Sequence, residues 1–280
     1  MTISRAVLVT GCSTGIGRAT ALRLHKAGLP VYATARRPEA IRDLPQLGIR
    51  TLQLDVTDEA SMRAAVDRVT SDHGAVGVLV NNAGYWLAGP VEETSPAEVS
   101  RQFETNVLGL IRLTQLVLPA MRAQRFGRIV NLSSIYGRFA VPGGAFYDAT
   151  KHAVSAFTDA LRQEVAPLGI GVALIEPGAT RTQLDANTIW TGDADGPYAR
   201  FRERLIAWHA DVYRQPSHNI AGRLAVEADD VARAIEAAIT APWPCARYPV
   251  GVLAHGLFFL RRWLPTRAFD AFVRRVFPAP

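Results

Sequence analysis

The sequence predicts an α/β fold in which a doubly wound parallel sheet carries helices on both faces. Short apolar runs and helix-like stretches alternate six times between residues 6 and 175. The runs hold apolar residues at consecutive positions, as strands covered on both faces do. A glycine-rich turn joins the first run to the first helix-like stretch. Strands and helices that alternate in this way form a parallel sheet.

The first half of the chain supplies four expected strands, at residues 6–10, 30–34, 51–54 and 76–80. A helix is expected over residues 18–26, after the glycine-rich turn, and Gly28 ends it. Asp58 is a typical helix N-cap residue, and the stretch after it has apolar residues on one side. The fourth strand runs into the sequence Asn81-Asn-Ala-Gly84.

The second half continues the alternation and then departs from it. We expect a long helix at about 96–122, a strand at 128–132, a helix from Tyr147 to about 166 and a strand at 171–175. Residues 180–225 show no regular pattern, and long segments of this kind are often lids. A helix at 229–239 and a last strand at 247–251 follow. The expected organisation is one domain over residues 1–280, with a core at about 3–182 and 227–251, a substrate lid at about 183–226 and an amphipathic tail at about 252–280.

Length and composition fit a soluble globular protein with one sizeable core. The chain has 280 residues, of which 49% are apolar and 20% are charged. Its net charge of +6 comes from scattered arginines without a recognised nucleic-acid module, so no nucleic-acid partner is expected. Cys12 and Cys245 form neither a disulfide framework nor a metal spacing, which favours a reducing compartment and no metal site. The chain shows no signal peptide and no membrane-length apolar run, so we expect a cytoplasmic protein.

Tyr147 and Lys151 stand four residues apart at the start of an expected helix. This spacing puts both side chains on one helical face. A free phenol has a pKa of about 10 and a nearby cation lowers it, so the pair can exchange a proton near neutral pH. The chain has only two lysines, Lys26 and Lys151, which favours a specific use of the ammonium group here. The alternative is an incidental pair on a helix surface.

A phosphate site is indicated by the turn between the first strand and the first helix. Gly11, Gly15 and Gly17 let the backbone approach a pyrophosphate, and the helix N-terminus offers free N–H groups. Their spacing departs from G-x-G-x-x-G, and a simple strand-to-helix turn is the alternative. The second strand ends at Arg36 and Arg37 without the acid that binds the ribose of NAD. We therefore expect NADP(H) to be favoured over NAD(H), unless both arginines are only loop surface.

An ordered set of motifs identifies a family. The chain contains, in this order, Thr10-Gly-Cys-Ser-Thr-Gly-Ile-Gly17, Asn81-Asn-Ala-Gly84, Asn106, Ser134, Tyr147-x-x-x-Lys151 and Pro177-Gly178. With them it resembles the classical short-chain dehydrogenases/reductases, which have a Rossmann-like fold. The resemblance covers roughly residues 3–182 and, more loosely, 227–251. The Gly-Cys-Ser-Thr-Gly turn is similar to that of members acting on steroids, retinoids and other lipid-like alcohols or ketones.

The resemblance implies a role for each of four catalytic positions. Tyr147 would be the general acid in reduction and the general base in oxidation. Lys151 would lower the pKa of Tyr147 and hold the nicotinamide ribose. Ser134 would hydrogen-bond the substrate oxygen, and Asn106 would hold a water of a proton relay behind the lysine. Hydride transfer beside a phenol and a hydroxyl is coherent chemistry for an alcohol and its carbonyl compound.

The resemblance also implies a set of cofactor-binding positions. They comprise the glycine turn, the two arginines after the second strand, a pair that would contact adenine, the Asn-Ala-Gly segment, the Tyr/Lys pair and residues near the nicotinamide. In chain order these are Gly11, Ser13, Thr14, Gly15, Ile16, Gly17, Arg36, Arg37, Asp55, Val56, Asn82, Ala83, Gly84, Tyr147, Lys151, Pro177, Gly178 and Thr182.

The substrate is expected over the carboxyl ends of the strands, as in other open α/β sheets. The expected contributors are largely aromatic or apolar, which suggests a medium or bulky apolar alcohol or carbonyl substrate. They are Tyr85, Trp86, Tyr136, Phe139, Val141 and the stretch at 184–213, with Trp190 and Trp208 as pocket or packing residues.

The amphipathic tail has three interpretations. It could close the substrate pocket, pack on another subunit of a homodimer or homotetramer, or lie on a membrane surface, which is the least favoured.

Two other functions stay open on the sequence. One is a dinucleotide-binding regulator without turnover, against which the complete set Asn106, Ser134, Tyr147 and Lys151 argues. The other is a sugar-nucleotide epimerase or dehydratase, for which the chain is short and the glycine spacing less suitable.

Overall fold

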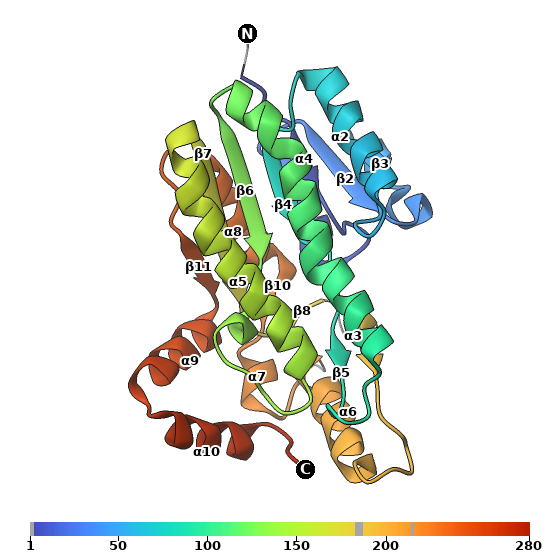
Figure 1. Ribbon diagram of the computed structural model, residues 1–280, viewed down its shortest axis with the longest axis vertical. Coiled ribbons are helices and arrows are strands. Elements are labelled where there is room, and N and C mark those ends of the chain that lie inside the picture. Colours follow the sequence, from blue (N-terminus) through green and yellow to red (C-terminus); the bar gives the residue numbers. More distant parts are fainter. Residues whose placement is uncertain (1–2, 183–186, 214–215) are drawn as a thin grey trace.

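The structure is a computed structural model that describes residues 3–182, 187–213 and 216–280. Its centre is a seven-stranded sheet in the order β11-β7-β6-β4-β1-β2-β3 (Figure 1). Every neighbouring pair in this sheet is parallel, as predicted. The strands are β1 (Val7–Val9), β2 (Val31–Ala35), β3 (Arg50–Gln53), β4 (Val78–Asn81), β6 (Gly127–Leu132), β7 (Ile170–Pro177) and β11 (Arg247–Val250).

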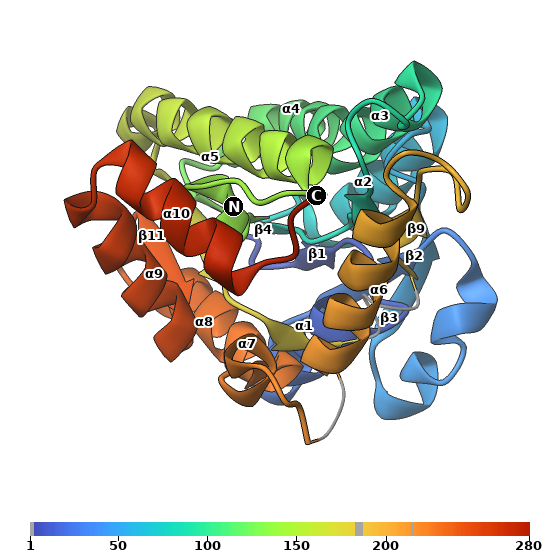
Figure 2. The same ribbon diagram turned by 90° about the horizontal axis from the view of Figure 1, so that it is seen from below.

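Helices cover both faces of this sheet, which confirms the doubly wound arrangement (Figure 2). One face carries α2 (Glu59–His73), α4 (Gly109–Ala123) and α5 (Ala145–Val165); the other carries α1 (Gly15–Lys26) and α8 (Ala228–Thr240). In β1, Leu8 packs in the core under α2, α4 and α5, whereas Val7 and Val9 pack in the core under α1 and α8. Successive strand residues point to opposite faces, so consecutive apolar residues are buried on both sides.

The helix expected at 96–122 is interrupted. α3 (Pro96–Phe103) begins with a capping box between Ser95 and Glu98, and a π-helical turn (Glu104–Leu108) separates it from α4. Such turns carry one residue more than the α-helical repeat and are frequent at functional sites. Here the turn contains Asn106, whose side chain is buried.

The region expected to be an irregular lid contains a regular helix, α6 (Ala199–Tyr213). Its buried residues, Phe201, Leu205, His209 and Val212, recur every three to four positions. That period is helical, but the dense Asp, Gly and Pro before it hid the pattern. The shorter elements nearby are α7 (Ile220–Arg223) and two parallel two-stranded sheets, β5 (Leu87–Ala88) with β9 (Ile189–Trp190) and β8 (Thr180–Arg181) with β10 (Val226–Glu227).

The tail forms two helices, α9 (Val252–Trp263) and α10 (Thr266–Val276), at the carboxyl end of the sheet (Figure 1). Phe269, Val273 and Phe277 are buried in a cluster with Phe139 and Val141 from the loop before α5. The apolar stripe of α10 is therefore used within the chain, which supports the first of the three interpretations of the tail. Among the described residues, no helix combines the length and apolarity needed to cross a membrane.

Candidate active site

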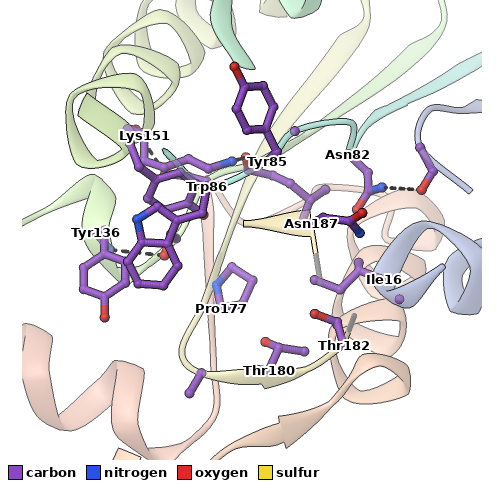
Figure 3. A pocket seen from close by; sticks show the side chains of 18 of the residues that line it. Ile16, Asn82, Tyr85, Trp86, Tyr136, Lys151, Pro177, Thr180, Thr182 and Asn187 are labelled. Atoms are coloured by element: carbon purple, nitrogen blue, oxygen red, sulfur yellow. Dashed lines mark hydrogen bonds between the residues drawn. The ribbon is translucent and has the colours of Figure 1, made fainter. Parts of the chain in front are cut away.

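A cavity of about 970 Å³ lies at the carboxyl ends of the strands. Residues of the glycine turn line one part of it, and Ser134, Tyr147 and Lys151 line another. In Figure 3, Trp86 and Tyr136 lie on the side of Lys151, whereas Ile16 and Asn82 lie across the cavity. The fold thus brings most of the predicted cofactor and catalytic positions to one site, although Gly11 and Thr182 lie 171 residues apart in the sequence.

The glycine turn is shaped by backbone geometry that other residues would disturb. Gly11 and Gly15 have φ angles of +71° and +56°, in the left-handed region that favours glycine. A Cβ atom on Gly17 would lie 2.3 Å from the carbonyl oxygen of Gly11. Asn82 fixes the turn from the neighbouring strand, because its Nδ2 donates to the carbonyl oxygens of Thr10 at 2.8 Å and Gly11 at 3.1 Å.

The N-terminus of α1 fits a phosphate group. The N-cap residue Thr14 makes no side-chain capping hydrogen bond, and the first turn of the helix contains no acidic residue. The first N–H groups of a helix lack partners within it, and the helix dipole favours an anion there. Four consecutive residues of this turn line the cavity, namely Ser13, Thr14, Gly15 and Ile16.

Arg36 and Arg37 follow β2 and line the same cavity. Both are exposed, so their guanidinium groups are available to a ligand. Val56 lines the cavity after β3, as expected for an adenine contact. Asp55 is outside the lining, and its carboxylate accepts hydrogen bonds from the backbone N–H and the hydroxyl of Thr57. The sequence predicted that Asp55 contacts adenine. In the structure the Asp55 side chain instead bonds Thr57 in the turn that precedes α2.

Tyr147 and Lys151 come from α5, Ser134 comes from the segment after β6, and all three line the cavity. Tyr147 and Lys151 lie on one face of α5, and the Lys151 Nζ is 5.4 Å from the centroid of the Tyr147 ring. The same Nζ donates a hydrogen bond of 2.9 Å to the carbonyl oxygen of Leu132, at the end of β6. Ser134 lies two residues further along, and its side chain lowers the pKa of Tyr147. All three residues are at most 8% exposed.

Burial controls the protonation of this group of residues. Burial is the main reason why the pKa of Tyr147 lies above its ordinary value of 10. Charges on Tyr213 and Asp148 raise this pKa further, and the interaction with Ser134 lowers it without reversing the rise. Burial also lowers the pKa of Lys151 to about 8. Lys151 is not among the groups that shift the pKa of Tyr147 here, so the lowering of that pKa by Lys151 stays a prediction. The ammonium group donates to the Leu132 carbonyl oxygen and lies over the phenol ring of Tyr147.

Asn106 holds the segment that follows Asn82, Ala83 and Gly84. Its Oδ1 accepts from the backbone N–H of Tyr85 at 3.1 Å, and its Nδ2 donates to the Tyr85 carbonyl oxygen at 3.0 Å and the Thr150 hydroxyl at 3.3 Å. Thr150 precedes Lys151, so Asn106 joins the cofactor segment to α5. Asn106 itself does not line the cavity.

The substrate wall is partly the one predicted. Tyr85, Trp86, Tyr136 and Trp208 line the cavity, and the Trp86 ring lies 5.4 Å from the ring of Tyr147, centroid to centroid. Phe139 and Val141 do not line it, because they are buried against the tail helices. Trp190 also lies outside the lining and packs edge-on against His209 at 5.2 Å. Leu184, the first residue of the predicted stretch, lies outside the described residues.

The tail contributes cavity residues that the sequence did not assign. They are all apolar and come from α9, α10 and the residue after it, namely Leu253, Leu257, Phe272, Val276 and Phe277. His209 and Val212 of α6, which belong to the predicted stretch at 184–213, line the cavity too. The helical period of the tail indicated a buried face, but periodicity cannot say which surface covers it. The remaining predicted cofactor residues, Ala83, Gly84, Pro177, Gly178 and Thr182, line the cavity, whereas Gly17 supports the turn from behind.

Comparison with known proteins gives the family. A family model described as short chain dehydrogenase matches residues 5–191. An uncharacterized oxidoreductase YbbO of Escherichia coli is 34% identical over 270 residues, which are 96% of this chain and 93% of the relative. Retinol dehydrogenase 5 of Mus musculus is 32% identical over 285 residues, covering 98% and 89% of the two chains. The chain therefore belongs to the short-chain dehydrogenase/reductase family and is an oxidoreductase of that family.

Solved structures agree with this assignment. A short-chain dehydrogenase from Streptomyces avermitilis superposes with a TM-score of 0.79 at 33% identity, over 97% of both chains. Among other similar structures, some were solved with NADP or NADPH and one with NADH. The Rossmann-like prediction is thus confirmed, and the neighbours bind either dinucleotide.

Proposed function

We propose that this protein is an NADP(H)-dependent oxidoreductase that interconverts an apolar alcohol and its ketone or aldehyde. The observation that carries the proposal is that one cavity of about 970 Å³ holds both the glycine turn and the candidate catalytic residues. One part of it has the glycine turn and the free N-terminus of α1, another has the buried Tyr147, Lys151 and Ser134, and apolar residues of the tail cover it. A mostly apolar pocket with a few polar groups is typical of a small-molecule site.

Tyr147 is the proposed proton donor and acceptor. Its raised pKa keeps the phenol protonated at neutral pH, which suits the donation of a proton to a carbonyl oxygen during reduction. In the oxidising direction the phenol must first give up its own proton to solvent, and the phenolate oxygen then takes the proton from the alcohol. A bound nicotinamide supplies or accepts the hydride at the substrate carbon.

Ser134 and Lys151 are proposed to support Tyr147. The Ser134 hydroxyl, which lowers the pKa of Tyr147, is proposed to bond the substrate oxygen and stabilise its developing charge. The Lys151 ammonium is proposed to hold the nicotinamide ribose. Asn106 is proposed as a positioning residue, because its three hydrogen bonds join the Tyr85 backbone to Thr150 beside Lys151.

The coenzyme preference is proposed from the end of β2. An exposed pair, Arg36 and Arg37, lines the cavity there, at the place where an acid would bind the ribose hydroxyls of NAD. A guanidinium can bind a phosphate through two parallel hydrogen bonds. The 2′-phosphate of NADP is therefore the expected occupant.

The substrate class is proposed from the cavity wall. Trp86 and Tyr136 lie beside Tyr147, with ring centroids 5.4 and 6.4 Å from its own. Leu257, Phe272 and Phe277 continue this wall toward the tail. Such a wall favours a medium or bulky lipid-like alcohol or carbonyl compound over a small polar one.

The test is a substrate screen with the purified protein, followed by NADPH absorbance in both directions. Lipid-like ketones, aldehydes and alcohols should be turned over, and small polar carbonyl compounds should be poor substrates. Tyr147→Phe is the control for turnover at this site. Tight NADPH binding with no turnover across the panel would favour a non-catalytic regulator, and activity on a nucleotide sugar would overturn the substrate class.

A further inference from the structure

α9 carries an exposed apolar stripe. Val252, Phe259 and Trp263 are 74%, 68% and 69% exposed. They are spaced by seven and four residues, so they lie on one face of the helix. The rings of Phe259 and Trp263 are 6.3 Å apart, centroid to centroid, so they form one apolar surface. Two neighbouring aromatic rings are unfavourable in water, because burying apolar surface is favourable.

The sequence around this stripe is strongly basic. Residues 252–280 contain five arginines and a single acidic residue, Asp270. Arg261 stacks on Phe269, while Arg262, Arg267, Arg274 and Arg275 are exposed. An exposed aromatic stripe on a helix next to several arginines is the pattern of helices that lie in the interface of an anionic bilayer.

The opposite face of the same helix belongs to the cavity. Leu253 and Leu257 line the cavity, and Ala254 and Leu257 are buried. α9 therefore separates the cavity from the exposed stripe by the width of one helix. One face of α9 is thus an exposed apolar surface, and the other borders an apolar cavity. This arrangement suits a ligand that resides in lipid.

We infer that α9 and α10 form a peripheral docking surface for an anionic lipid bilayer, with Phe259 and Trp263 inserted among the headgroups. A second copy of this chain is a poorer occupant. Across a two-fold interface the same patch would face itself, and the exposed arginines would meet with like charge. The inference concerns binding to lipid and holds whichever substrate the cavity takes.

The experiment is vesicle flotation of the full chain. Vesicles of phosphatidylcholine alone are compared with vesicles that also contain phosphatidylglycerol, at low and high salt. The wild type should float with the anionic vesicles, and binding should weaken as salt screens the arginines. Phe259→Ser/Trp263→Ser should weaken binding by about tenfold or more, because the aromatic side chains supply the apolar part.

Trp243→Ser is the matched control. Trp243 is 92% exposed, but it precedes β11, whereas α9 follows that strand. This variant should float like the wild type, and thermal unfolding should show that every variant is folded. Absence of wild-type binding to anionic vesicles, or equal binding by the Phe259/Trp263 variant, would overturn the inference. So would a stable dimer that dissociates in that variant, since the stripe would then be a subunit interface.

Discussion

Removing a single oxygen atom from Tyr147 tests the proposed proton transfer. In Tyr147→Phe the ring keeps its contacts with Trp86 and Tyr136, so the shape of the cavity should be preserved. Ser134 still accepts from the backbone N–H of Tyr136 at 3.3 Å. The free energy of unfolding should therefore change by no more than about 1 kcal/mol.

The effect on turnover should be far larger. A positioned general acid contributes about 10²–10⁴ in rate, which corresponds to roughly 3–5 kcal/mol of barrier. The raised pKa of Tyr147 means that its proton is present throughout the neutral range, so the full effect should appear at pH 7. NADPH binding should be nearly unchanged, because the phenol ring and Lys151 remain.

The assay is steady-state reduction of the best substrate from the panel, with NADPH affinity measured separately by fluorescence titration. Tyr136→Phe is the matched control, because it removes the same atom from a neighbouring ring of the same cavity. It should lower kcat by less than about tenfold, since Tyr136 is not proposed to transfer the proton. Full activity in Tyr147→Phe, or a greater loss in Tyr136→Phe, would refute the assignment of the acid.

Three further changes test the rest of the site. Arg36→Ala should raise the KM for NADPH about 10–100-fold and leave the KM for NADH nearly unchanged, because only NADPH has the 2′-phosphate. Steady-state kinetics with both coenzymes measure this, and Arg42→Ala is the control, because Arg42 is a nearby exposed arginine outside the cavity lining. An unchanged coenzyme preference in Arg36→Ala would contradict the assignment of Arg36 to the 2′-phosphate. Gly17→Ala should weaken NADPH binding, measured by calorimetry, at least about tenfold, because the added Cβ would lie 2.3 Å from the carbonyl oxygen of Gly11. Gly256→Ala is the control and should bind NADPH normally, because a Cβ added there would meet no neighbouring group within 4 Å. The pKa of Lys151 is lowered from 10.5 to about 8, so the unfolded chain binds more protons between these values. The free energy of unfolding of the wild type should therefore rise relative to Lys151→Met across this range, by about 3 kcal/mol in denaturant titrations, and a flat difference would contradict the burial of a charged lysine.

Local signals were enough to predict the core of the fold. Continuous apolar runs predicted the strands, and Asp58 predicted the start of α2, where its side chain accepts from the N–H of Ala60. The turn with Gly11 and Gly15 was recognisable because left-handed backbone requires glycine. Each of these signals depends on a few consecutive residues, so sequence alone could carry it.

The spacing of Tyr147 and Lys151 was equally local, but their protonation was not. The sequence placed a cation beside a phenol and predicted a lowered pKa. In the folded chain both groups are buried, so desolvation raises the pKa of Tyr147 and lowers that of Lys151. Desolvation depends on every residue packed around a group, and most of those residues are distant in sequence.

What the sequence by itself determined is the doubly wound sheet, the glycine turn and the order of the candidate catalytic residues. Only the tertiary structure decided what covers the cavity. It turned Phe139 toward Phe269 of α10, brought Leu257 and Phe277 into the cavity wall, and left Phe259 and Trp263 outside. The physical reason is that helical periodicity fixes which residues share a face, whereas the partner of that face is set by contacts between distant segments.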